Sequence, residues 1–135
     1  MAGFVFNRGA LGLLDGSIDW AADTIKARLV LTSETLSKDS TSMTGIGDAA
    51  TDVVLSGKTG PTEDTANDRV GYDASDPTFS AVASTSPMDQ IVIFKHVTND
   101  AGSTPIAVLD ITEKTPSGAD VVVTLPSGAA FYVQQ

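Results

Sequence analysis

The sequence contains no cysteine and only one histidine, His96. Without cysteine, neither a disulfide nor a thiolate metal site can form, so the fold has to be stabilised by its core or by contacts between subunits. A zinc site is not expected, because zinc takes several His or Cys ligands. No nucleophile motif such as G-x-S-x-G accompanies His96, which we interpret as a histidine at the end of a strand.

Positive charge and long apolar runs are also scarce. Eight Lys and Arg residues face 17 Asp and Glu residues, which gives a formal net charge of −9 at pH 7. This charge repels nucleic-acid phosphates and anionic lipids, so we expect neither nucleic acid nor membrane as a partner. No apolar run is long enough to cross a bilayer, and the first residues lack the pattern of a signal peptide. We therefore expect a soluble protein that is made in a cytoplasm.

Aromatic residues are few, with one Trp, two Tyr and five Phe in 135 residues. They are spread along the chain as core residues are, and do not form a shelf for a sugar or a base. Acidic residues are plentiful, and Asp15, Asp19 and Asp23 recur every four residues. Their spacing does not match an EF-hand, so we interpret them as turn formers, with a loosely held Ca²⁺ as the alternative. We predict no cofactor and no enzymatic activity.

Two short apolar runs, rich in β-branched residues, predict the centre of the fold. Residues 91–94 and 106–109 are too short for helices and lack a polar face, which indicates buried strands. Between them, residues 98–104 carry the Asn, Asp and Gly that a chain reversal needs. We predict a long β-hairpin in the middle of a sheet.

The rest of the chain predicts an all-β fold. Residues 25–31 alternate between apolar and polar side chains at their start, as a half-buried strand does. A short helix is expected within residues 10–16, ending at Gly16. Further strands are expected at residues 4–6, 52–56, 69–73, 78–82, 119–125 and 129–133. About eight strands and at most one short helix predict a single antiparallel β-sandwich or jelly-roll-like domain over residues 1–135.

Two polar segments interrupt the predicted strands. Residues 32–51 consist mainly of Ser, Thr, Asp and Gly, with Leu36, Met43 and Ile46 among them, and residues 57–68 form a second polar run. A loop as long as the first is unusual in a compact domain, so we expect it to be mobile, ordered by a neighbouring subunit, or functional. It is our leading candidate for an interaction surface.

Four motifs follow one another in a fixed order. They are G-S-I-D-W-A-A-D-T-I-K at residues 16–26, F-S-A at 79–81, Q-I-V-I-F-K at 90–95 and P-I-A-V-L-D-I at 105–111. In this order and spacing, the chain resembles small β-rich virion proteins of tailed bacteriophages. It departs from that family's pattern at residues 27–28, at Ile106 and in the loop of residues 32–51. The resemblance therefore implies least about the role of this loop. The resemblance implies no catalytic residues.

The resemblance implies a structural role in a virion. We expect a capsid decoration (cement) protein that binds the outside of the assembled head and stabilises it by bridging capsomers, with the major capsid protein as its partner. Such proteins are usually trimers at threefold positions, so a homotrimer is expected. The alternative is a tail, baseplate or fibre-associated virion protein with a role in host-surface adhesion. A third interpretation, from a different functional class, is a carbohydrate-binding or small hydrolytic domain.

The expected contacts with the shell are mainly apolar residues in segments too short or too polar to bury them within one subunit. Together with one arginine, they are Phe4, Val5, Phe6, Arg8, Leu36, Met43, Ile46 and Tyr132. Residues 1–8 would then form an N-terminal arm, and deletion of residues 1–7 should reduce shell binding and leave the fold intact. Arg28 and Arg69 are further candidates for bridges to acidic patches on the shell. The alternatives are packing within the same domain for the apolar residues and a role in solubility for the arginines.

Overall fold

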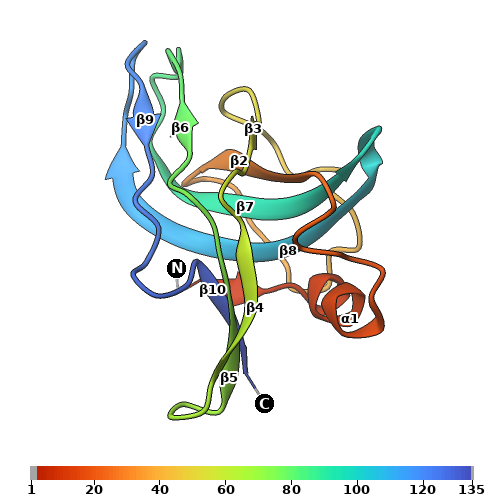
Figure 1. Ribbon diagram of the computed structural model, residues 1–135. Coiled ribbons are helices and arrows are strands. Elements are labelled where there is room, and N and C mark those ends of the chain that lie inside the picture. The colour runs from red at the N-terminus through yellow and green to blue at the C-terminus, as the bar shows by residue number, and fades with distance from the viewer. Residues whose placement is uncertain (1–2, 135) are drawn as a thin grey trace.

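The computed structural model describes residues 3–134, and its largest sheet has five strands in the order β1-β8-β7-β2-β3 (Figure 1). Its strands are β1 (Phe4–Val5), β2 (Ile25–Leu31), β3 (Val53–Val54), β7 (Met88–Val97) and β8 (Asn99–Lys114). The predicted hairpin is formed by β7 and β8 and lies in the middle of this sheet. Its reversal is tighter than expected, because β8 begins directly after Thr98, which has a φ of 53°.

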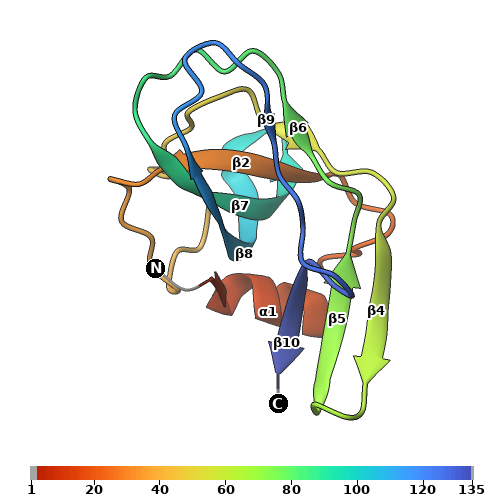
Figure 2. The ribbon, with the colours of Figure 1, turned by 90° about the vertical axis from the view of Figure 1, so that its left-hand side faces the viewer.

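Two smaller sheets pack against this large one (Figure 2). One has the order β10-β5-β4 and the other pairs β6 with β9, and every strand pair in the described residues is antiparallel. Their strands are β4 (Thr59–Asp64), β5 (Arg69–Asp73), β6 (Thr78–Phe79), β9 (Val121–Val122) and β10 (Phe131–Gln134). The chain therefore has the predicted all-β, sandwich-like fold, with ten strands in the described residues where about eight were expected.

An aromatic cluster forms the centre of the core between the sheets. Trp20 contacts Tyr72 and Phe131 edge-on, with ring centroids 5.6 and 5.4 Å apart, and the rings of Tyr72 and Phe131 stack at 5.2 Å. The indole nitrogen of Trp20 donates a hydrogen bond to the carbonyl of Asp73 at 3.1 Å. This bond satisfies the one polar atom of the side chain inside the core. Trp20 thus packs into the core at the corner where the sequence places it.

The helix α1 (Asn7–Asp15) ends at Gly16, as predicted, and begins three residues earlier than expected. Gly16 has a φ of 81°, the left-handed conformation that closes many helices. Two glycines weaken the helix by propensity, but they lie on its buried face. A Cβ atom on Gly9 would stand 2.5 Å from the Cα of Ile106. Glycine therefore allows α1 to lie directly against β8.

Strand β4 was not predicted, because residues 57–68 were expected to form a loop. Its residues are all exposed or half-exposed, so it has no apolar face and no alternation for the sequence to reveal. It is an edge strand that pairs only with β5, and the pairing is irregular between Thr59 and Thr62. The hairpin of β4 and β5 extends away from the large sheet (Figures 1 and 2). Backbone pairing, rather than burial, creates this strand.

The loop of residues 32–51 covers the second face of the large sheet. It contains no helix or strand, as expected, but it is packed against its own chain, since the amide of Met43 bonds to the carbonyls of Asp100 and Ser103 at 3.1 Å each. The buried residues on this face are Phe6, Val30, Met43, Ile46, Val92, Phe94 and Val108. The expectation that Phe6, Met43 and Ile46 are left uncovered by their own chain is therefore wrong. Both faces of β7 are buried, as its continuous apolar run predicts.

Arg28 in β2 joins this loop to the central hairpin. Its guanidinium forms two hydrogen bonds to Asp52, two to Asp100 and one to the carbonyl of Ile46, all between 2.8 and 3.1 Å. The residue is only 3% exposed, so the expectation of a surface arginine that bridges to a partner is wrong. Hydrogen bonds to Asp52 raise the pKa of Arg28, and those from Arg28 lower the pKa of Asp100. We call these residues the Arg28 cluster.

Stability should fall in acid partly through Asp100. Because Arg28 lowers its pKa in the folded protein, Asp100 stabilises the fold above its unfolded pKa of about 3.9. This contribution is lost as the pH falls below that value, through the folded pKa. Urea denaturation at pH 7 and at pH 3 should therefore show a smaller loss of stability for Asp100→Asn than for the wild type. An equal loss in the two proteins would contradict the prediction.

Candidate functional site

Three of the residues predicted to contact a shell lie around one groove. Phe4, Val5 and Tyr132 line a cavity of about 480 Å³ between β1 and β10, together with Leu109 and Asp110 of β8. All three predicted residues are half-buried. We call this cavity the β1–β10 groove. Segments that lie far apart in the sequence thus present apolar side chains to one surface.

Two cationic side chains contact aromatic rings of this groove. The guanidinium carbon of Arg69 lies 3.5 Å from the centre of the Tyr132 ring, and Arg69 also pairs with Asp64 at 2.8 Å. Lys38 lies 5.7 Å from the centre of the Phe4 ring. Contacts of a cation with a ring face are attractive and restrict the ring. Arg69 therefore already has partners in its own chain.

The groove also exposes the edge of a central strand. Strand β1 pairs with β8 only at residues 107–108, and the next contact on this side is the hydrogen bond from the amide of Phe6 to the carbonyl of Ile106. Backbone groups of an antiparallel strand point to alternate sides, so those of Asp110 face the same edge as those of Val108; beyond Asp110 the pairing of β8 with β7 becomes irregular. Within residues 3–134, no strand other than β1 pairs with β8 there. In the described part of the chain, Asp110 therefore has no strand partner on this side of β8.

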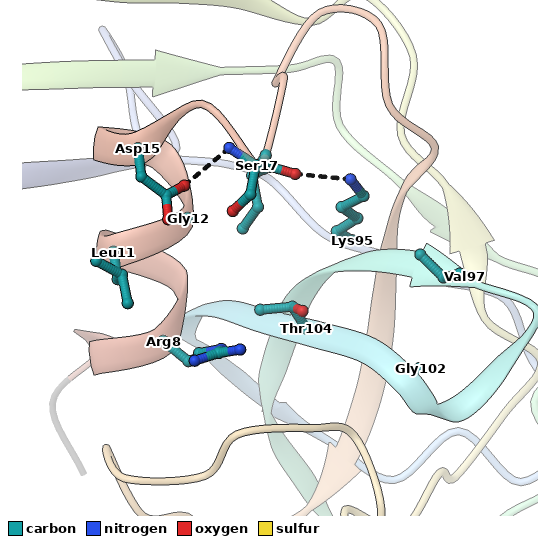
Figure 3. Close-up of a pocket in the computed structure, with 10 residues that line it drawn as sticks. Arg8, Leu11, Gly12, Asp15, Ser17, Lys95, Val97, Gly102 and Thr104 are labelled. Atoms are coloured by element: carbon teal, nitrogen blue, oxygen red, sulfur yellow. Dashed lines mark hydrogen bonds between the residues drawn. The ribbon is translucent and has the colours of Figure 1, made fainter.

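Arg8 lies in a different cavity, between α1 and the reversal of the central hairpin (Figure 3). This cavity of about 350 Å³ is lined by Arg8, Leu11, Asp15, Ser17, Lys95, Val97 and Thr104, among others. We call it the α1–hairpin pocket. Lys95 donates to the carbonyl of Ser17 at 2.7 Å and pairs with Asp23 at 2.9 Å. Asp15 accepts a hydrogen bond from the amide of Ser17, and hydrogen bonding by Ser17 lowers the pKa of Asp15.

Neither family models, nor curated proteins, nor solved structures match this chain. In the described part of the chain, no helix has the length and apolar character that crossing a membrane requires.

The recurring aspartates have structural partners. Asp19 accepts hydrogen bonds from the amides of Ala21 and Ala22, and Asp23 accepts one from the amide of Asp19. The interpretation of Asp19 and Asp23 as turn formers is thus confirmed. Among residues 3–134, no group of three or more His, Cys, Asp or Glu side chains stands close enough to hold a metal ion.

The sequence predicted the groove residues only as separate contacts. Val5 and Tyr132 are far apart in the chain, and only the pairing of β1 with β8 and of β10 with β5 brings them together. Leu36 lies half-buried against the second face of the large sheet. Met1 and Ala2 of the predicted arm lie outside the described residues, as does Gln135. The alternative of a short edge strand is what the structure has at Phe4 and Val5.

Proposed function

We propose that the protein is a capsid decoration protein that binds the outside of an assembled phage head and bridges its capsomers. The observation that carries this proposal is the β1–β10 groove, where, within residues 3–134, β1 covers only two residues of the edge of β8 beside Phe4, Val5 and Tyr132. An extended segment of the major capsid protein would pair with β8 at this edge, and its side chains would enter the groove. Backbone pairing would supply affinity, and the apolar lining would supply specificity.

Charge and symmetry support the same role. A net charge of −9 suits the outer surface of a head, away from packaged DNA, whose phosphates it would repel. Bridging capsomers requires several equivalent contacts at once, so we propose a homotrimer at threefold positions. The motif resemblance to virion proteins of tailed phages supplies the class of partner.

Co-sedimentation with empty, expanded capsids tests the proposal. Tyr132→Ala should weaken binding about tenfold or more, because large aromatic residues supply most of the affinity in such contacts. Asp110→Pro should also weaken binding, since proline removes an outward N–H group from the edge of β8 at the groove. Val54→Ala is the matched control, because Val54 is an exposed apolar residue on the opposite edge strand, β3.

Each result has a distinct meaning for this role. Wild-type protein that sediments with capsids, together with weak binding by both groove variants, would support it. Wild-type protein that ignores capsids but binds purified tails would overturn it in favour of a tail or baseplate role. Capsid binding that neither variant alters would show that the groove is not the attachment surface. Light scattering on the free protein tests the trimer.

A further inference from the structure

The α1–hairpin pocket contains a guanidinium without an ion-pair partner in residues 3–134. Arg28, Arg69 and Lys95 each pair with an acidic side chain, whereas Arg8 forms no such pair in the described residues, as is also the case for four lysines, Lys26, Lys38, Lys58 and Lys114. Figure 3 shows Arg8 extending from α1 toward β8, with Thr104 opposite, and Asp15 turned toward Ser17 instead. The guanidinium lines the pocket together with Asp15 and forms no ion pair with it, although its charge helps to lower the pKa of that carboxyl. The guanidinium favours an anion from outside the chain.

Exposed apolar side chains lie at the same pocket. The described residues expose five large apolar side chains, of which Leu11 at 50% and Val97 at 43% line the pocket, while Leu14 at 80% lies further along α1. Leu11 follows Arg8 by three residues on α1, and Leu14 follows Leu11 by three, so each successive pair consists of neighbours on the helix surface. A small anion bound to Arg8 would leave both leucines in water. A protein segment that carries a carboxylate beside an apolar residue would cover them.

The charge of the protein also selects among anions. Nucleic acids and anionic membranes carry many negative charges, which a surface with a net charge of −9 repels. A single carboxylate flanked by apolar residues adds one attractive contact with Arg8 and little repulsion. Arginine suits this role, because its fork of N–H groups matches the two oxygens of a carboxylate.

We propose that the α1–hairpin pocket receives a Glu or Asp side chain of a protein partner, with its carboxylate on Arg8. Thr104 lines the same pocket, where its hydroxyl offers a further donor, and an apolar residue next to the acid covers Leu11. The proposal rests on the proposed function in one respect: the partner is the shell protein. The pocket would then be a second attachment point, separate from the β1–β10 groove.

A capped Leu-Glu-Leu tripeptide tests the pocket directly. In NMR titrations, it should shift the Arg8 side-chain signal and the backbone amides of Leu11 and Thr104, and a Leu-Gln-Leu peptide should bind at least fivefold more weakly. Arg8→Glu should abolish the shifts. This variant should fold, because Arg8 is exposed and an acidic residue in the first turn of a helix is favourable.

Lys26→Glu is the matched control. It introduces the same change of charge at a half-exposed lysine of β2 that does not line the pocket, and it should bind the peptide as the wild type does. In the capsid assay, Arg8→Glu should bind at least tenfold more weakly than Lys26→Glu. Equal binding of the two variants to capsids would overturn the assignment of the pocket to the shell.

The two assays distinguish a failure of the pocket proposal from a failure of the proposed function. Peptide binding that depends on Arg8, in a protein that ignores capsids, would support the pocket and overturn the decoration role. No shift with the glutamate peptide would overturn the pocket, whatever the capsid assay gives. Equal binding of the glutamate and glutamine peptides would overturn recognition of a carboxylate.

Discussion

Arg28→Ala should lower the free energy of unfolding by about 3–5 kcal/mol, the usual loss when one member of a buried ion pair is removed. The change removes five hydrogen bonds and leaves Asp52 and Asp100 as neighbouring carboxylates without their cation. The side chains of these acids are 18% and 49% exposed, so water can hydrate them in part. This places the expected loss toward the lower end of the range.

Urea denaturation at pH 7 measures this loss. Lys26→Ala is the control on the same strand, and it should change stability by less than about 0.5 kcal/mol, as most surface substitutions do. A loss below about 1 kcal/mol for Arg28→Ala would mean that the Arg28 cluster does not hold the loop to the hairpin. In that case, the loop of residues 32–51 would be held by its apolar residues Leu36, Met43 and Ile46 and by its backbone hydrogen bonds.

Phe6→Ala should cost about 3–5 kcal/mol of stability, as large-to-small changes at buried aromatic residues do. Phe6 is fully buried on the second face of the large sheet, and its amide bonds to Ile106 at 2.8 Å. Deletion of residues 1–7 would remove this side chain too. The structure therefore contradicts the expectation that such a deletion leaves the fold intact.

Phe4→Ala is the control for Phe6→Ala. Phe4 is half-buried and lies next to Phe6, with ring centroids 5.0 Å apart, so its truncation should cost clearly less. Thermal or urea denaturation of both variants makes the comparison. Equal losses of stability would show that the buried Phe6 stabilises the fold no more than the half-buried Phe4 does. For shell binding, Phe4 is thus a better target for mutation than a deletion.

Strands that bury a face could be predicted from the sequence. The bounds of β2 and β5 match the expected residues, because burial on one face imposes alternation. The expectation that β2 is only half-buried is wrong, since Arg28 and Val30 on its second face are buried too. The hairpin of β7 and β8 followed from its two apolar runs. Strand β4 could not be predicted in this way, because its side chains stay in water and only the backbone of β5 orders it.

The candidate site could be predicted only in part. Phe4, Val5 and Tyr132 were correctly expected to be incompletely buried, and they meet in one groove. Phe6, Met43 and Ile46 belong to the same apolar class in similarly short or polar segments, yet they are buried. Local sequence does not distinguish the two groups, because burial of an isolated apolar residue depends on which distant segment lies over it.

The sequence by itself determined the all-β class, the central hairpin, the short helix ending at Gly16 and the acidic character of the surface. These features depend on side-chain period, turn chemistry and charge, which are local or additive properties. Tertiary structure alone decided that Arg28 is an internal link, that the polar loop covers the sheet and that Arg8 faces a pocket of its own. These features depend on contacts between segments many residues apart, which no local pattern records.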